Sequence, residues 1–212
     1  MKHWILITLL CVRSFAFAAD AAGPGCDRLT LVLDPRLTTA VVDQRWASGE
    51  SSTEAAANLE LRGCKGELLD RMQLDGPLAR VDRHPLRGTN APTYLVTVDL
   101  TAPMGSYSGP LSVPVQVINH KLQRADATTS DGRIEPINLP LTGKAAWKKI
   151  SIGTTDDLLA VNCQPQANGF VTTFRRYHST RHGWQVRMRS EPILWESDGA
   201  FPKARRFPGV AQ

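Results

Sequence analysis

The chain has 212 residues, with 25 basic and 20 acidic side chains and a formal net charge of +5. Hydrophobic residues make up 42% of the chain and charged residues 21%. These values are ordinary for a folded globular protein and exclude a chain that is disordered throughout. The length is enough for one substantial domain or two small ones.

The first eighteen residues have the pattern of a secretory signal peptide. Lys2 supplies positive charge, residues 4–12 are almost entirely apolar, and residues 16–18 have the small-x-small form that signal peptidase accepts. We expect cleavage between Ala18 and Ala19. The apolar run is shorter than the roughly 20 residues of a membrane-spanning helix. The sequence therefore predicts a periplasmic or secreted protein that is not integral to the membrane.

Short strand-like segments separated by turn residues follow the leader. In chain order, the pattern predicts strands over residues 29–33, 40–46, 58–62, 68–74, 94–100 and 111–117. Next to the strands predicted over residues 58–62 and 68–74, a helix through residues 53–57 is a competing interpretation, because alanine and glutamate favour helices. Leu95 makes its strand partly two-sided. Pro114 predicts that its strand lies at a sheet edge or begins after the proline, because proline cannot donate a ladder hydrogen bond.

The C-terminal half contains one helix candidate and the clearest hairpin. Residues 144–149 favour a short helix, and residues 158–163 read as a buried strand. Residues 169–178 and 183–189 flank a polar turn and alternate in the way that paired antiparallel strands do. We expect a mainly β fold, a single antiparallel sandwich or curved-sheet domain over residues 19–200 with at most one or two short helices. Residues 201–212, rich in proline and charge, read as an extended tail.

Three cysteines remain after the leader is removed, and an oxidising compartment favours one disulfide between them. We predict Cys26–Cys64, which would tie the start of the mature chain to a nearby turn, although pairings that use Cys163 stay open. Cys163 itself reads as a small buried strand residue. The leader cysteine Cys11 follows leucine, and Cys26 lacks the apolar residue three places upstream, so neither fits a lipidation motif.

Charge is unevenly distributed. Residues 19–100 hold 9 basic and 12 acidic side chains, whereas residues 101–212 hold 14 and 8. The basic excess concentrates around the hairpin, and strand alternation puts two of its arginines on one face with two more available across the turn. The predicted ligand-binding residues are Arg175, Arg176, Arg187 and Arg189. Arginine suits phosphate or carboxylate groups; exposed arginines without a ligand are the alternative interpretation.

Other motifs are weaker. His178 and His182 have the spacing of two zinc ligands on a helix, but they flank a predicted hairpin turn. Residues 182–187 resemble the His-Gly-Cys-x-x-Arg signature of L,D-transpeptidases, with Trp184 in the place of the nucleophilic cysteine, so that activity is not expected. Gly105 to Gly109 lacks the central serine of a nucleophile elbow. Asp156 and Asp157 read as turn residues. We predict no catalytic residue, metal site or cofactor.

The functional hypothesis is a non-catalytic binding or accessory protein of the cell envelope, which could be inhibitor-like or immunity-like. Its partner would be an anionic envelope component or another exported protein, and not nucleic acid, for which no signature is present. One alternative is an envelope hydrolase or transferase whose site is assembled from distant loops. The polar residues available for such a site are His84, His120, His178, His182, Asp198 and Cys163. A second alternative is a structural component of a surface assembly, which would need open strand edges.

Overall fold

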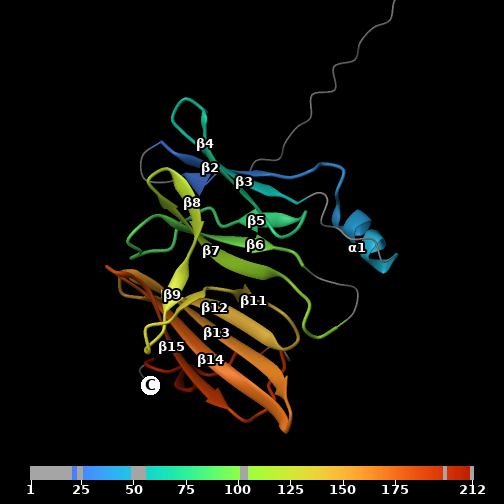
Figure 1. Ribbon diagram of the computed structural model, residues 1–212, viewed down its shortest axis with the longest axis vertical. Coiled ribbons are helices and arrows are strands. Elements are labelled where there is room, and N and C mark those ends of the chain that lie inside the picture. Colours follow the sequence, from blue (N-terminus) through green and yellow to red (C-terminus); the bar gives the residue numbers. More distant parts are fainter. Residues whose placement is uncertain (1–20, 23–25, 49–55, 101–104, 198–199, 211–212) are drawn as a thin grey trace, which may run out of the picture.

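The computed structural model describes residues 21–22, 26–48, 56–100, 105–197 and 200–210. The predicted signal peptide and its cleavage site lie outside these residues, as do Asp198 and most of the segment 53–57. The described part of the chain is mainly β, with three sheets and one α-helix (Figure 1). The predicted fold class is thereby confirmed.

Two sheets form the upper half of the molecule in Figure 1. The N-terminal sheet is antiparallel, with its strands in chain order: β1 (Ala21–Ala22), β2 (Arg28–Val32), β3 (Asn58–Arg62) and β4 (Leu68–Gln73). The central sheet has the order β11 (Leu139–Pro140), β7 (Leu111–Ile118), β6 (Thr93–Val98) and β5 (Ala79–Val81), and β8 (Lys121–Arg124) also pairs with β7.

The C-terminal sheet forms the lower half. Its order is β10 (Ile134–Pro136), β9 (Asp126–Thr128), β15 (Gly183–Glu191), β14 (Gly169–Thr180), β13 (Thr155–Gln166) and β12 (Ala145–Ile152). All neighbours are antiparallel except β9 and β15, which are parallel. The hairpin predicted from the sequence is confirmed as β14–β15, and its two-residue turn is Arg181–His182.

Burial explains how the sheets associate. All six residues of β6 are buried, because the strand contributes to two cores. Tyr94 and Val96 belong to the core between the N-terminal and central sheets, whereas Leu95 packs with Leu158 and Trp184 of the C-terminal sheet. The predicted two-sided character of this strand is confirmed.

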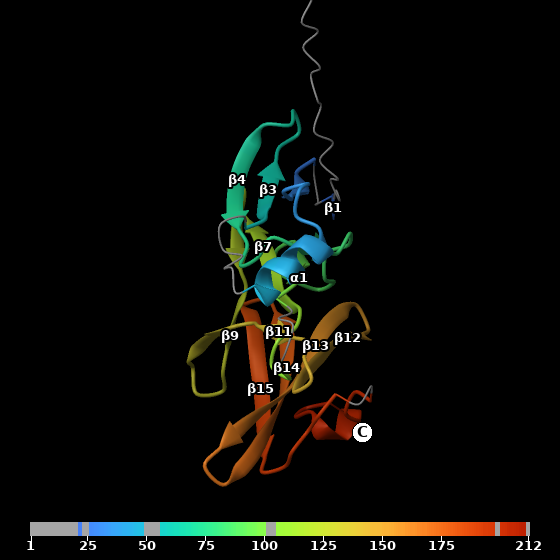
Figure 2. The ribbon, with the colours of Figure 1, turned by 90° about the vertical axis from the view of Figure 1, so that its right-hand side faces the viewer.

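A third core lies on the other face of the C-terminal sheet, which we call the outer face. There Leu159, Val161 and Phe174 pack with Phe207 from the C-terminal segment. This segment, residues 200–210, contains the 3₁₀ turn η2 (Ala204–Arg206) and lies beside the sheet in Figure 2. Phe207 is 2% exposed, so the segment contributes to the core.

Three element predictions are wrong, each for a physical reason. Residues 40–46 are helical, within α1 (Thr39–Ala47). Thr38 caps this helix, because its Oγ1 accepts from the Val41 amide while its carbonyl accepts from the Val42 amide. Residues 144–149 do not form a helix, because pairing with β13 makes them part of the edge strand β12.

The third wrong prediction is the edge position of Pro114. This residue lies inside β7, which has neighbouring strands on both sides. Its carbonyl accepts from the Ala125 amide on the side where β7 passes from pairing with β11 to pairing with β8. In an antiparallel strand the nitrogen of a residue faces the same side as its carbonyl. The proline nitrogen therefore faces a change of neighbouring strand, where the lack of an N–H interrupts no continuous ladder.

Candidate functional site

The strand register gathers polar side chains on the outer face of the C-terminal sheet. Asp157 of β13 lies one residue beyond the last register pair with β14 and contacts His178 of β14, which lies opposite Gln185 of β15. Two residues along, Arg176 lies opposite Arg187. Because residues two apart on a strand share a face, these five side chains project to the same side, next to the C-terminal segment.

Asp157 organises this group. Its carboxylate is fully buried, and burial of an unpaired charge would be costly. Arg176 donates from Nε to Oδ2 at 2.6 Å, and His178 Nδ1 is 2.6 Å from Oδ1. The contact through Nδ1 leaves Nε2 as the available ring nitrogen of His178. Arg176 also donates to the carbonyl of Gly209, which fixes the guanidinium between the sheet and the C-terminal segment.

A small cleft of about 180 Å³ opens over these residues, lined by Arg176, His178, Gln185 and Arg187. The charge of Arg176 is balanced by Asp157. The Arg187 side chain has no ion-pair or hydrogen-bond partner among the residues that the structure describes. Within the described part of the chain, the cleft therefore carries a positive charge without a counter-charge and several hydrogen-bond donors, a combination suited to an oxyanion.

A second polar cavity continues from this cleft. It has a volume of about 290 Å³ and shares Gln185 and Arg187 with the cleft. Its other lining residues include Thr128, Thr129 and Ser130. The two neighbouring cavities thus offer charged donors on one side of Gln185 and Arg187 and hydroxyl groups on the other.

The four predicted arginines do not act as one group. Arg176 and Arg187 meet in the cleft. Arg189 lies on the same face but is paired with Glu191, and hydrogen bonding from Arg189 lowers the pKa of that carboxyl below its ordinary value. Arg175 projects from the opposite face, with Nε 3.8 Å from a carboxylate oxygen of Glu135.

Sequence reasoning missed Asp157 as a member of the site. Asp156 and Asp157 look alike as turn residues, yet both lie inside β13 and are buried on opposite faces. Asp156 pairs with Arg87, whereas Asp157 pairs with Arg176 and His178. The available signal was strand alternation around residues 155–163, which would have extended the predicted strand toward the aspartates.

The remaining motifs do not converge on a site. His182 lies in the hairpin turn and its Nε2 accepts a hydrogen bond from Arg181, away from the contact that His178 makes with Asp157. Trp184 is buried in the core, in agreement with its interpretation as a packing residue. Cys163 is a buried free cysteine whose Sγ accepts from the Trp195 amide.

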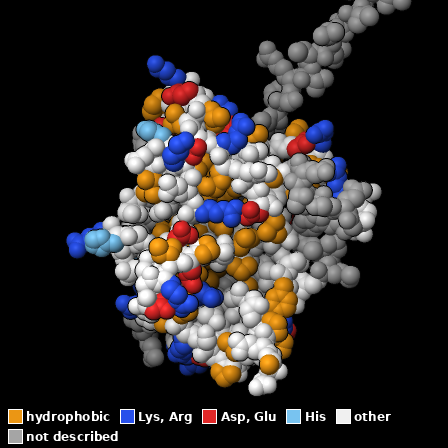
Figure 3. All heavy atoms as spheres, viewed as in Figure 1, with side chains coloured by type: hydrophobic (Ala, Val, Ile, Leu, Met, Phe, Trp, Pro, Cys, Tyr) orange, Lys and Arg blue, Asp and Glu red, His pale blue; other side chains and the backbone are white. Residues whose placement is uncertain are grey.

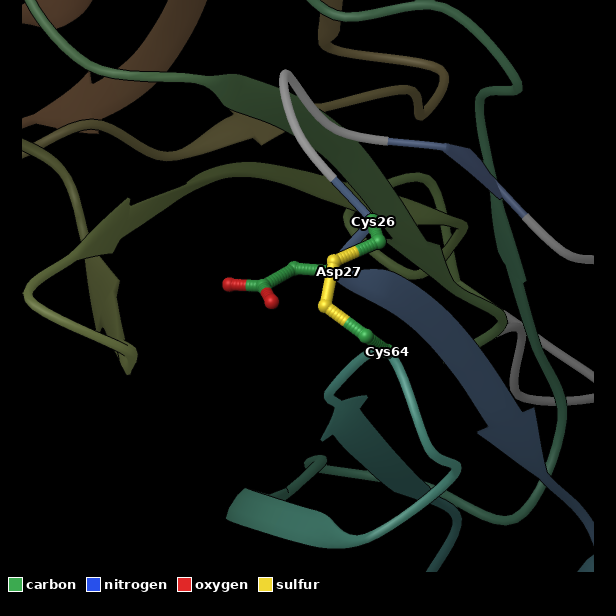
Figure 4. Close-up of side chains that lie close together, drawn as sticks. All are labelled: Cys26, Asp27 and Cys64. Carbon is green, nitrogen blue, oxygen red and sulfur yellow. A yellow bond between two sulfur atoms is a disulfide. The ribbon is translucent and has the colours of Figure 1, made fainter.

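The predicted Cys26–Cys64 disulfide is confirmed. Figure 4 shows it with Asp27 beside it, and the potential ligand atoms of the three residues lie within 4.8 Å of one another. Metal coordination by cysteine uses the thiolate, and both sulfurs here are committed to the disulfide. Asp27 contacts His120 Nδ1 at 2.9 Å. We therefore interpret this cluster as a structural cross-link.

The ion pairs explain the surface in Figure 3. Basic and acidic side chains are interspersed on the face that it shows, and 14 ion pairs join described residues. The excess of basic residues in the C-terminal half thus has less local effect than the sequence suggests. An arginine without a counter-charge among the described residues, such as Arg187, is therefore a better indicator of an anion-binding site than the total charge of the chain.

Comparison with known proteins gives no match: none of the family models, curated proteins or solved structures that were searched resembles this chain significantly. Within the described residues, no helix has the length and apolar character needed to cross a membrane.

Proposed function

We propose that this chain is an exported, non-catalytic binding protein of the cell envelope, and that its ligand presents an anionic group to the cleft at Arg176 and Arg187. The guanidinium of Arg187, which has no partner among the described residues and lies next to an arginine held in place by Asp157, is the observation that carries the proposal. Export itself is proposed from the leader over residues 1–18, and the Cys26–Cys64 disulfide is compatible with an oxidising compartment.

The shape of the groove narrows the ligand class. Drug-sized ligands occupy pockets of roughly 300–1,000 Å³, so a cleft of about 180 Å³ accepts a single phosphate, sulfate or carboxylate group. The adjoining cavity with Thr128 and Ser130 offers hydroxyl partners to a polar ligand. An anionic polysaccharide of the envelope supplies both features. An acidic segment of another exported protein, as an inhibitor or immunity protein would bind, is the alternative partner.

One observation favours a hydrolase as a second candidate. A buried aspartate that holds the Nδ1 side of a histidine is the arrangement that orients a general base. His178 could then accept a proton from water attacking an ester of the bound anion. The described residues that line the cleft include no serine, threonine or cysteine, so the covalent chemistry of a transferase is not supported there. Hydrolysis by water needs no such residue; we favour binding because three of the four described lining residues, Arg176, Arg187 and Gln185, are hydrogen-bond donors suited to holding an anion.

The proposal is tested with Arg187→Gln and the matched control Arg181→Gln, which changes an exposed arginine in the turn of the same hairpin. Binding of a phosphorylated disaccharide and of its neutral counterpart is measured by calorimetry at low and high salt. A hydrogen bond to a charged group contributes about 1.5–3 kcal/mol, so Arg187→Gln should weaken binding roughly 10-fold to 100-fold. Arg181→Gln should bind the phosphorylated disaccharide as the wild type does, and the affinity for the neutral disaccharide should not depend on Arg187.

Affinity that is independent of salt and of Arg187 would contradict the binding proposal. Slow release of phosphate from the same disaccharide, abolished by His178→Gln while binding persists, would instead establish the hydrolase.

A further inference from the structure

A second groove, separate from the polar cleft, lies on the outer face where β15 leads into the C-terminal segment. It has a volume of about 340 Å³. One wall is the chain around Leu194, the other is the stretch from Pro202 to Arg206, and Phe174 lies at its base. The lining comprises five apolar residues and three cations: Phe174, Ile193, Leu194, Trp195, Pro202, Lys203, Arg205 and Arg206.

The first wall is fixed by its backbone. Thr172 Oγ1 donates to the Ile193 carbonyl at 2.7 Å, and the Trp195 amide donates to Cys163 Sγ at 3.4 Å. These contacts hold the segment against the sheet, while the side chains of Ile193 and Leu194 remain 37% and 52% exposed. Two large aliphatic side chains are thus presented to solvent on a rigid support.

Aromatic packing and one ion pair fix the second wall. Phe207 contacts Phe174 edge-to-face with ring centroids 5.6 Å apart, and it stacks on Phe201 at 5.2 Å. Arg206 pairs with Glu191. The groove is therefore preformed between two anchored segments, as small-molecule sites usually are.

The rim of the groove is positively charged. Arg206 is engaged by Glu191, but the side chains of Lys203 and Arg205 have no ion-pair or hydrogen-bond partner in the described ranges. Among the described residues that line the groove there is no carboxylate or amide side chain. The groove thus combines an apolar interior with two available cations at one wall.

We propose that this groove binds a single-chain anionic amphiphile, with its hydrocarbon tail against Leu194 and Trp195 and its carboxylate or phosphate head at Lys203 and Arg205. A hydrocarbon chain needs no hydrogen-bond partner, in accordance with the lining. A peptide would bring backbone N–H and C=O groups that require partners when buried. The inference is independent of the polar cleft, because none of the residues that line the two sites is shared.

Trp195 provides a direct readout. Dodecyl phosphate is the probe, titrated below its critical micelle concentration, and binding is followed by calorimetry. A doxyl-labelled fatty acid with the spin label on its chain should quench the fluorescence of the protein, and Trp195→Phe should remove most of that quenching. Each additional buried methylene should strengthen binding roughly fourfold along a series of alkyl phosphates.

Two variants test the head and tail contacts separately. The double variant Lys203→Gln with Arg205→Gln should weaken dodecyl phosphate binding roughly tenfold, and should leave binding of uncharged dodecyl maltoside unchanged. Leu194→Asp should weaken both ligands. Arg187→Gln is the control and should leave the quenching at Trp195 unchanged, because a phosphate head that binds in the cleft does not contact Trp195; this readout separates the inference from the function proposed for the cleft.

Equal affinity for the phosphate and the maltoside, or an unchanged affinity in the double variant, would overturn the proposal. Failure of monomeric dodecyl phosphate to bind, together with adsorption to phosphatidylglycerol vesicles, would also overturn it, because the surface would then recognise a membrane and not a single amphiphile. Circular dichroism of each variant confirms that the β fold is retained.

Discussion

Asp156 provides the most quantitative test of the structure. The residue is 2% exposed, and its carboxylate accepts from the backbone amide of Arg87 at 3.0 Å, from Arg87 Nη2 at 2.9 Å and from Ser151 Oγ at 2.7 Å. Burial is the largest single influence and raises the pKa of Asp156. The hydrogen bonds from Arg87 and Ser151 together outweigh it and lower the pKa from 3.8 to about 2.

The sign of the resulting pH dependence follows from this shift. The unfolded chain binds the proton at higher pH than the folded protein, so between about pH 4 and pH 2 folding becomes weaker as the pH falls. Each pKa unit corresponds to about 1.4 kcal/mol. The charged form of Asp156 therefore contributes about 2 kcal/mol, a contribution that is complete at neutral pH and lost as the pH falls through 2.

The substitution Asp156→Asn should remove that contribution. We expect its free energy of unfolding to be about 2 kcal/mol below the wild-type value at pH 7, with the difference shrinking between pH 4 and pH 2. Urea unfolding at a series of pH values measures both curves. Asp43→Asn, which alters an exposed carboxylate on α1, is the control. Its free energy of unfolding should equal the wild-type value at each pH. A difference that is constant with pH would refute the electrostatic reasoning.

Three further predictions concern the supports of the fold. Replacing Cys26 and Cys64 by serine should lower stability by about 4 kcal/mol, from the loop-closure entropy of a separation of 38 residues, measured by thermal unfolding. Phe207→Ala should cost about 3 kcal/mol and expose the C-terminal segment to limited proteolysis, which a firmly docked segment would resist. Gly88 has φ +72°, and an added Cβ would meet the Cα of the first residue of β13 at 2.9 Å. Gly88→Ala should therefore destabilise more than Gly66→Ala, which has a similar φ and open space; equal losses would show that backbone strain alone is responsible.

Strand alternation predicts much of this fold because most strands pair with close neighbours along the chain. The β3–β4 and β14–β15 pairs are of this kind. Local preference fails where distant pairing decides the outcome. Residues 144–149 favour a helix by composition, yet Ala146 and Lys148 lie opposite Val161 and Leu159 in the sheet. The energy of that pairing exceeds the small differences in helix propensity.

The site was only partly predictable for a related reason. The sequence predicts that Arg175 or Arg176 lies across the hairpin from Arg187, but it places the turn over residues 179–182. The turn has only two residues, and this register fixes Arg176 as the residue opposite Arg187. The sequence does not indicate that Asp157 lies beside them, since that depends on how β13 pairs with β14. Nor does it show that Glu191 engages Arg189, which removes one predicted arginine from the set available to a ligand.

The C-terminal segment connects both proposed sites to the stability of the outer core. Gly209 accepts from Arg176 at the polar cleft, while Pro202 and Arg205 form a wall of the apolar groove. An added Cβ at Gly209 would lie 2.8 Å from Arg187 Nη1, so glycine permits the close approach of the segment to the cleft. Phe207, between these two contacts, anchors the segment. Detachment of the segment should therefore weaken both sites together, whereas changes at Arg187 or at Lys203 should act on one site alone.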